Sequence, residues 1–254
     1  MQAARDTARS PGPQRGQATL PGAVLRPVRS HAFEACVEQL ATAIRLGIYP
    51  LGSTLPPERE LAEQLHVSRA TLREAMAALR QAGLVATTRG RGGGTVVTLK
   101  PPTPSARAAA RTTPAQRAEW LDALAFRRII EPGAAATVAA GDLSEEGRRQ
   151  LLAAHEEVDA ATRAAHYRQS DSRFHLTIAT LTGSSRVIDA VTSVQAIVHE
   201  MLLAIPQLPT NIAHSDAQHT AVVQAILEGR PDAARRAMEQ HCDDTAALLR
   251  GLLT

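Results

Sequence analysis

The chain has 254 residues, of which 44% are hydrophobic and 21% are charged, enough for two small domains with buried cores. Aromatic residues make up only 2%, which argues against a base-stacking single-strand binder or an aromatic-rich β-sandwich. With two cysteines and no long apolar run, the sequence predicts no disulfide framework, no membrane span and no secretory signal, and therefore a cytoplasmic protein.

Charge and histidine are distributed unevenly along the chain. Residues 1–100 carry 13 Lys/Arg and 7 Asp/Glu, a net charge of +6, whereas the remainder carries −3. This indicates that only the first part meets a polyanion. Of the 9 histidines, 7 lie after position 100. Because a neutral imidazole is a common metal ligand, metal chemistry is expected in the second part.

The N-terminal part shows a tail followed by three helical patterns. Residues 1–24 have neither helical nor strand periodicity, so we expect a disordered tail. Apolar residues then recur at three- and four-residue steps. Ser68 is the predicted N-cap of the third helix, and Gly47 and Gly83 are the predicted stops of the first and third. The predicted helices cover 31–46, 57–65 and 69–82.

Two β-prone stretches, 84–88 and 95–99, flank a glycine turn and predict a hairpin. The proline-rich segment 101–114 is the predicted linker. The sequence therefore predicts a mainly α protein, with a winged helix-turn-helix domain over 25–100 and an all-helical bundle over 115–254. Six or seven helices are expected in the bundle, from the periodic segments 115–140, 144–164, 166–182, 185–204, 215–228 and 231–250.

The third predicted helix has the features of a DNA-reading helix. Backbone amides at its polar cap, Ser68, can hold a phosphate. Arg69, Ala70 and Thr71 lie on its first turn, where side chains reach base edges in the major groove. Arg73 follows one turn later, beside Arg69. A single arginine is usually a solvated surface charge and a cap can be purely structural, so the whole pattern is needed to indicate duplex DNA.

The predicted hairpin carries two further cations. Arg89 and Arg91 flank Gly90 on the glycine turn and could enter the neighbouring minor groove. The glycines could equally form only a flexible turn. Cap, helix cations, basic hairpin and net positive charge together favour a DNA-binding domain.

Two stretches resemble the DNA-binding domain of the GntR transcription regulators. They are LPPERELA at 55–62 and VSRATLREA at 67–75. In that family Ala70 stands where some relatives have a polar residue, which leaves at most an apolar contact with a thymine methyl group. The resemblance implies DNA contacts from Arg59, Ser68, Arg69, Thr71 and Arg73, and from the wing at Arg89, Gly90 and Arg91.

The second part contains four candidate metal ligands. Asp171 and His175 are four residues apart, so they lie on one face of a helix. His219 and His241 lie at equal distances from the predicted turn at 229–231, so an antiparallel helix pair would bring them to equal height. Three histidines and a carboxylate suit a divalent metal: zinc, nickel or manganese. Alternatively, the Asp/His pair is a surface hydrogen bond and the single histidines are structural.

This part also resembles the FCD-type ligand-binding domain of the FadR-like branch of GntR regulators. The similar residues are RRIIEP at 127–132, Asp171, Phe174 with His175, His219 and His241. The resemblance implies a helical bundle that binds a small carboxylate beside a divalent metal, with Arg127 pointing into the cavity. Alternatively, Arg127 only pairs with Glu131. Many relatives have Asn where Ser184 and Ser185 follow Gly183, which leaves the shape of the effector open.

These features predict a homodimeric transcription regulator, rather than an enzyme, that binds a palindromic operator in double-stranded DNA. A small organic acid at or near the metal would control its operator affinity, and repression is the expected role. Three alternatives stay open: a regulator that senses the metal itself, a helical metalloenzyme, and a purely structural metal.

Overall fold

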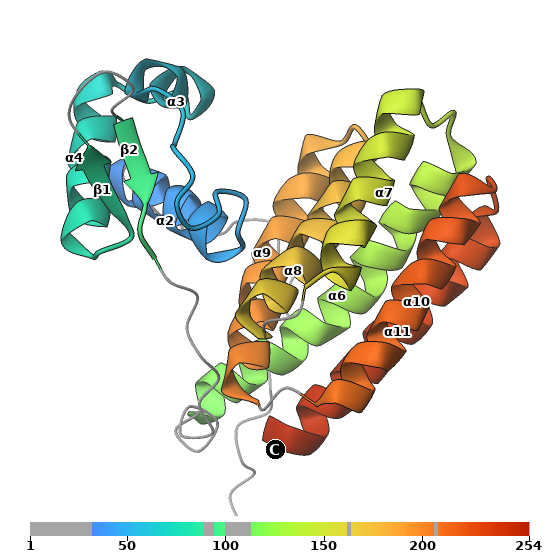
Figure 1. Cartoon of the computed structure of the whole chain (residues 1–254). Coiled ribbons are helices and arrows are strands. Elements are labelled where there is room, and N and C mark those ends of the chain that lie inside the picture. The colour runs from blue at the N-terminus through green and yellow to red at the C-terminus, as the bar shows by residue number, and fades with distance from the viewer. Residues whose placement is uncertain (1–31, 89–93, 100–112, 162–163, 206–207, 254) are drawn as a thin grey trace, which may run out of the picture. The chain divides into compact units, whose positions relative to one another are not determined.

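The computed structural model describes residues 32–88, 94–99, 113–161, 164–205 and 208–253. Within these ranges the chain forms nine helices and one two-stranded sheet (Figure 1), so the predicted mainly α fold is confirmed. The predicted tail, most of the predicted linker, and the wing residues Arg89, Gly90 and Arg91 lie outside the described residues.

The first group of elements has the order of a winged helix-turn-helix. Strands β1 and β2 pair antiparallel, with Val85 opposite Val97. The order and type of the five elements in this group agree with those predicted from the sequence. The ends of these elements differ from the predicted ends by at most a few residues. The elements are α2 (Ala32–Arg45), α3 (Glu58–Gln64), α4 (Arg69–Gln81), β1 (Val85–Thr88) and β2 (Gly94–Val97).

Local signals in the sequence set the ends of these helices. Ser68 caps α4, since its Oγ accepts a hydrogen bond from the Thr71 amide at 3.0 Å. Gly47 and Gly83 both have a φ of +74°, the left-handed conformation that favours glycine after a helix. The turn between α3 and α4 contains His66, whose φ is +52°. A small core closes beneath α4, built from Leu40, Ile44, Leu61, Leu72, Met76, Leu79 and Val97 among others.

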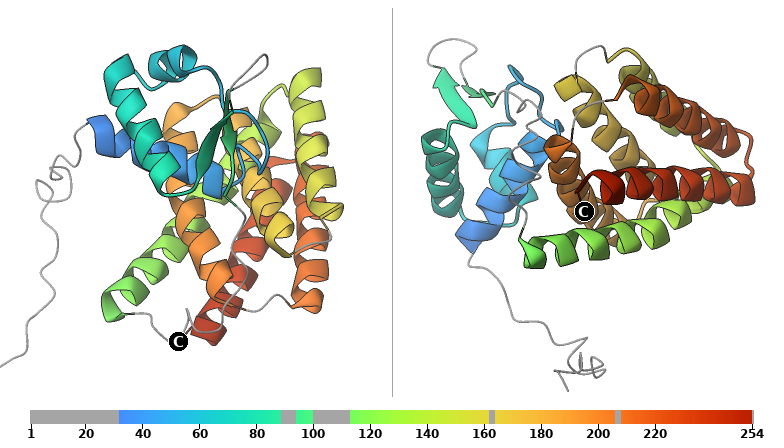
Figure 2. Two further views of the ribbon diagram at one scale, coloured as in Figure 1. Left: turned by 60° about the vertical axis from the view of Figure 1, so that its left-hand side comes forward. Right: turned by 90° about the horizontal axis from the view of Figure 1, so that it is seen from below.

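The second group is an all-helical bundle. Its six described helices agree with the predicted six or seven, and α6 runs unbroken past Trp120. Helix α11 packs along both α6 and α10 (Figures 1 and 2). The helices are α6 (Pro114–Ala140), α7 (Glu145–Asp159), α8 (Ala164–Leu181), α9 (Ser185–Ala204), α10 (Pro209–Leu227) and α11 (Pro231–Leu253).

The bundle core supports the centre of α8, α10 and α11. Phe174, Ile178, Val222, Ile226 and Met238 are buried in one apolar cluster. A second cluster surrounds Trp120 near the start of α6. Burial of an apolar stripe along a helix fixes the rotation of that helix, so the polar residues next to these positions are held at defined places inside the bundle.

Helix α9 is long and apolar enough to cross a membrane, although its sequence does not contain the uninterrupted apolar run expected of a span. It packs against α6 and α8, and Val191, Val194 and Val198 are buried there. The buried polar side chains Gln195 and His199 interrupt its apolar surface. These contacts are those of a core helix in a bundle.

Candidate metal and ligand site

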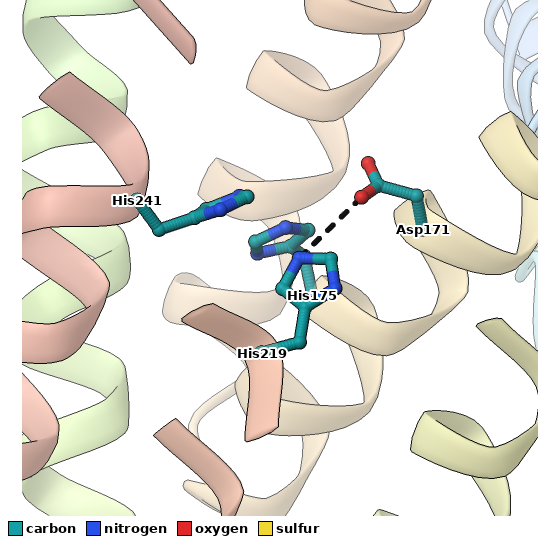
Figure 3. Close-up of side chains that lie close together, drawn as sticks. All are labelled: Asp171, His175, His219 and His241. Atoms are coloured by element: carbon teal, nitrogen blue, oxygen red, sulfur yellow. Dashed lines mark ion pairs between the residues drawn. The ribbon is translucent and has the colours of Figure 1, made fainter. Parts of the chain in front are cut away.

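The four candidate metal ligands lie together inside the bundle. Asp171 and His175 come from α8, His219 from α10 and His241 from α11 (Figure 3). One ligand atom from each residue lies within 4.8 Å of all the others, and all four residues are buried. His219 and His241 lie at the same height on α10 and α11, as expected, since their ring centroids are 4.6 Å apart.

Two of the cluster histidines, His219 and His241, are held in the neutral form that binds a metal. Burial, followed by the positive charge of neighbouring groups, holds the pKa values of His219 and His241 well below the ordinary value of 6.5. Burial also raises the pKa of Asp171. The imidazoles of His219 and His241 are therefore neutral at neutral pH, and a cation at the centre of the cluster would stabilise the ionised Asp171 carboxylate.

Neither ring nitrogen of His219 has a hydrogen-bond partner among the described residues. Its Nε2 lies 3.5 Å from Asp171 Oδ1 (dashed in Figure 3). Buried polar atoms without partners are rare in native proteins, and coordination of a bound ion is one of the standard ways in which they are satisfied. The donor set of three imidazoles and one carboxylate, with an unpartnered buried imidazole among them, fits a divalent metal.

At Nδ1, the other two histidines lie close to polar side chains outside the four-residue cluster. Nδ1 of His241 lies 3.2 Å from Gln218 Oε1, and Nδ1 of His175 lies 3.0 Å from Glu131 Oε2. In metal sites such partners fix the orientation of the ring and leave the opposite nitrogen free to ligate. Here the two Nε2 atoms are the ones turned toward Arg127.

Arg127 on α6 connects the cluster to a buried ion pair. Its Nε donates to Glu131 Oε2 at 3.0 Å, so the ion pair considered from the sequence is present. Its Nη2 lies 3.1 Å from the Nε2 atoms of both His175 and His241. The side chain is 1% exposed, and its Nη1 has no hydrogen-bond partner among the described residues.

The Arg127–Glu131 pair is stabilised by its surroundings. Burial would raise the pKa of Glu131, but Arg127 and then His175 outweigh it and lower this pKa to about 2. Gln195 Nε2 donates to Glu131 Oε1 at 2.6 Å, and Cys242 Sγ lies 3.8 Å from Oε2. Gln195 was not among the predicted site residues, because its only signal in the sequence is a polar residue in an apolar stretch of α9.

A cavity of about 50 Å³ adjoins the cluster, with room for a few water-sized groups. Arg127, Asp171 and His241 line it together with Tyr167 and Arg168. The placement of Arg127 at the cavity agrees with the sequence expectation, whereas Arg168 was not anticipated. The other lining residues are Leu202, Ile205, Leu208, Asn211, Ile212, Ser215, Thr245 and Leu248.

On the helix-turn-helix, the residues predicted to read DNA lie at the surface. Ser68, Arg69 and Ala70 are exposed at the start of α4, and Thr71 is half-buried. The exposed arginines Arg59 and Arg73 pair with Glu63 and Glu58, each at 3.6 Å. Such surface pairs contribute little, so the side chains can be redirected to a phosphate at little cost.

The two groups of elements define a class of protein: a DNA-binding winged helix-turn-helix joined to a helical domain with a buried polar site. Residues 33–97 match the bacterial regulatory proteins of the gntR family, and residues 122–244 match the FCD domain. The chain is 34% identical over 229 residues to the HTH-type transcriptional regulator RmpR of Mycobacterium gastri, covering 82% of this chain and 76% of that protein. It belongs to the GntR family and is a DNA-binding transcription regulator with an FCD domain, not an enzyme.

A second relative is the L-lactate dehydrogenase operon regulatory protein of Escherichia coli strain K12, 32% identical over 202 residues, or 75% of each chain. Among solved structures, McbR/YncC of E. coli superposes with a TM-score of 0.53 at 16% identity, covering 89% of this chain and 100% of that one. At this identity the match supports the fold alone. The metalloenzyme alternative is not supported by these relatives.

Proposed function

We propose that the FCD domain binds a divalent metal and a small carboxylate, and that the bound acid controls the affinity of the winged helix-turn-helix for its operator. The observation that carries this proposal is the convergence of four buried ligand atoms within 4.8 Å, next to a cavity lined by Arg127. Metal and acid would bind side by side within the bundle.

Asp171, His175, His219 and His241 would hold the metal, with zinc the best match to the donor set and nickel or manganese as alternatives. A bound divalent cation would coordinate a carboxylate oxygen of the acid and stabilise its negative charge. Gln218 and Glu131 would orient two of the imidazoles from outside. All four ligands come from helices, so the helical backbone would hold them in fixed positions.

Arg127 would bind the effector carboxylate through Nη1, which is free of other partners among the described residues. A guanidinium group matches the two oxygens of a carboxylate. The name of the E. coli relative, which refers to an L-lactate dehydrogenase operon, supports a small organic acid as the class of effector. The size of the adjoining cavity supports the same choice.

For the DNA interface we propose Arg59, Ser68, Arg69, Ala70, Thr71 and Arg73, with Arg89, Gly90 and Arg91 on the wing. A homodimer in the cytoplasm would bind a palindromic operator. Leu121, Phe126 and Ile129 are exposed apolar residues on α6, which supports an interface between two copies there. We propose repression, because blocking a promoter requires only occupancy of DNA, whereas activation needs a further contact with the polymerase.

Replacing His241 by alanine tests the metal site. Bound metal per chain should fall, because three remaining ligands hold the ion less tightly. The matched control is His214→Ala, an exposed histidine on α10 that lies outside the cluster. Elemental analysis of the purified proteins gives the answer, and one full equivalent of metal in the His241→Ala protein would show that the ligand set is wrong.

Replacing Arg69 by alanine tests the reading helix. Specific DNA affinity should fall by about 1–3 kcal/mol and base preference should relax at the contacted position. Arg235→Ala, an exposed arginine on α11, removes the same charge elsewhere. Gel-shift titrations at one salt concentration measure both. An unchanged footprint and affinity for Arg69→Ala would contradict the assigned helix.

Screening organic acids by thermal shift, with and without chelator, separates the remaining alternatives. An acid that raises the melting temperature and releases DNA only when metal is present supports the proposed function. DNA release by chelator alone, with no acid effective, would support metal sensing. A lower melting temperature in chelator with an unchanged acid response would make the metal structural.

A further inference from the structure

A second buried guanidinium lines the same cavity. Arg168 lies on α8, one turn before Asp171, and its side chain is 4% exposed. Its Nη2 donates to the carbonyl oxygen of Ile205 at 3.0 Å. Its Nη1 has no hydrogen-bond partner among the described residues. A buried charged donor without a partner is costly, and this one faces a cavity that a ligand can enter.

Arg168 also lacks an acidic partner of its own. Across the described ranges no carboxylate oxygen lies within 4.0 Å of it, whereas Arg127 pairs with Glu131 at 3.0 Å. The acidic residue whose field acts on Arg168 is Asp171, which the proposed function assigns to the metal. Asp216, beyond Tyr167, accepts a hydrogen bond from the Tyr167 hydroxyl at 2.9 Å and does not line the cavity.

The two guanidinium groups therefore differ in how their charge is compensated. Arg127 has the Glu131 carboxylate at 3.0 Å, whereas Arg168 has one backbone carbonyl for Nη2 and no partner among the described residues for Nη1. A buried charge without a counter-ion is unfavourable. A monocarboxylate bound at Arg127 would leave Arg168 without one.

We infer that the effector of this chain is a short dianionic organic acid, with one carboxylate at Arg127 and the metal and the second at Arg168. This inference rests on the proposed function and specifies its effector class. The two guanidinium groups supply unused donors at two places on the wall, and Asn211, Ser215 and Thr245 add neutral polar groups. Leu202 and Leu248 line the space that a short carbon chain would fill.

Succinate and butyrate are matched probes, because they have the same number of carbons and differ in the second carboxylate. Calorimetric titration of the metal-loaded full chain should show succinate binding at least tenfold more tightly than butyrate. Arg168→Gln should weaken succinate binding about ten- to hundredfold, the value expected for a charged hydrogen-bonded pair, and leave butyrate binding nearly unchanged. Arg186→Gln, an exposed arginine on α9, should change neither.

The variants also keep the inference testable if Arg168→Gln folds poorly. Arg168→Lys retains the charge and should keep part of the preference for succinate, and the melting temperature without ligand reports folding. In the wild-type protein, malonate, succinate and glutarate can be compared with their monocarboxylate counterparts. Equal binding of mono- and dicarboxylates, or an equal loss of both in Arg168→Gln, would overturn the inference and leave the proposed function intact. Failure of every acid of either kind to bind would overturn the proposed function as well.

Discussion

Replacing Glu131 by glutamine tests the buried ion pair that positions Arg127. The substitution keeps the shape of the side chain and its acceptor oxygen for Gln195, but it removes the charge that faces Arg127 at 3.0 Å. Both members of the pair are almost fully buried. The variant therefore leaves a guanidinium charge in the bundle without its carboxylate, which is the costly way to break a buried pair.

The size of the effect follows from the environment of Glu131. Its pKa falls from an ordinary 4.5 to about 2, a difference that corresponds to roughly 3 kcal/mol in favour of the ionised form in the folded protein. Breaking buried pairs typically costs about 3–5 kcal/mol. We therefore expect Glu131→Gln to lower the free energy of unfolding of the bundle by about 3 kcal/mol at neutral pH.

This contribution has a defined pH dependence. Because the pKa of Glu131 is lower in the folded state, its stabilisation is complete above about pH 4.5 and is lost as the pH falls toward about 2. The stability difference between wild type and Glu131→Gln should shrink to about half by about pH 3. Chelator must be present throughout, so that metal binding does not add to the difference.

The chain's single tryptophan, Trp120, lies in the bundle, so its fluorescence reports urea unfolding of that part. Glu146→Gln, which removes an exposed acid paired with Arg149, is the matched control and should leave the urea midpoint unchanged. An unchanged midpoint for Glu131→Gln, or a difference that grows as the pH falls, would refute the reasoning.

Two further substitutions test the helix cap and the proposed dimer surface. Ser68→Ala removes the oxygen that accepts a hydrogen bond from the Thr71 amide at 3.0 Å and should destabilise the helix-turn-helix by about 1 kcal/mol. Calorimetry should then show a lower melting temperature for that part, and Trp120 fluorescence should show an unchanged transition for the bundle. Ile129→Arg places a charge at a 70% exposed apolar position on α6 and should convert dimers to monomers in sedimentation velocity. An unchanged sedimentation coefficient would mean that any dimer uses another face.

Much of the fold was predictable because its signals are local. Apolar periodicity, the Ser68 cap and glycine stops located the elements of the helix-turn-helix to within a few residues. The bundle helices were located in the same way, except at the end of α7, predicted at residue 164 and found at Asp159, and at the start of α10, predicted at residue 215 and found at Pro209. A proline suits the first turn of a helix, but the polar residues that follow, including Asn211 and His214, hide the apolar pattern there.

The candidate site was predictable only in part. The four metal ligands could be grouped without knowledge of the packing. The grouping follows from the spacing of Asp171 and His175 and from the symmetry of His219 and His241 about a turn. By contrast, Arg168 and Gln195 acquire their positions from contacts between distant helices, with Ile205 and Glu131 respectively. No spacing rule connects such pairs, because the rotation and height of each helix depend on the whole core.

The burial of Cys242 beside Glu131 has a practical consequence. Cys36 and Cys242 are the chain's two cysteines, and both are buried. Burial raises the pKa of each thiol, that of Cys242 to about 12, which disfavours the thiolate that attacks peroxides and disulfides. The protein can therefore be purified in air without thiol reductants, which themselves compete for zinc, and its native metal content can be measured undisturbed.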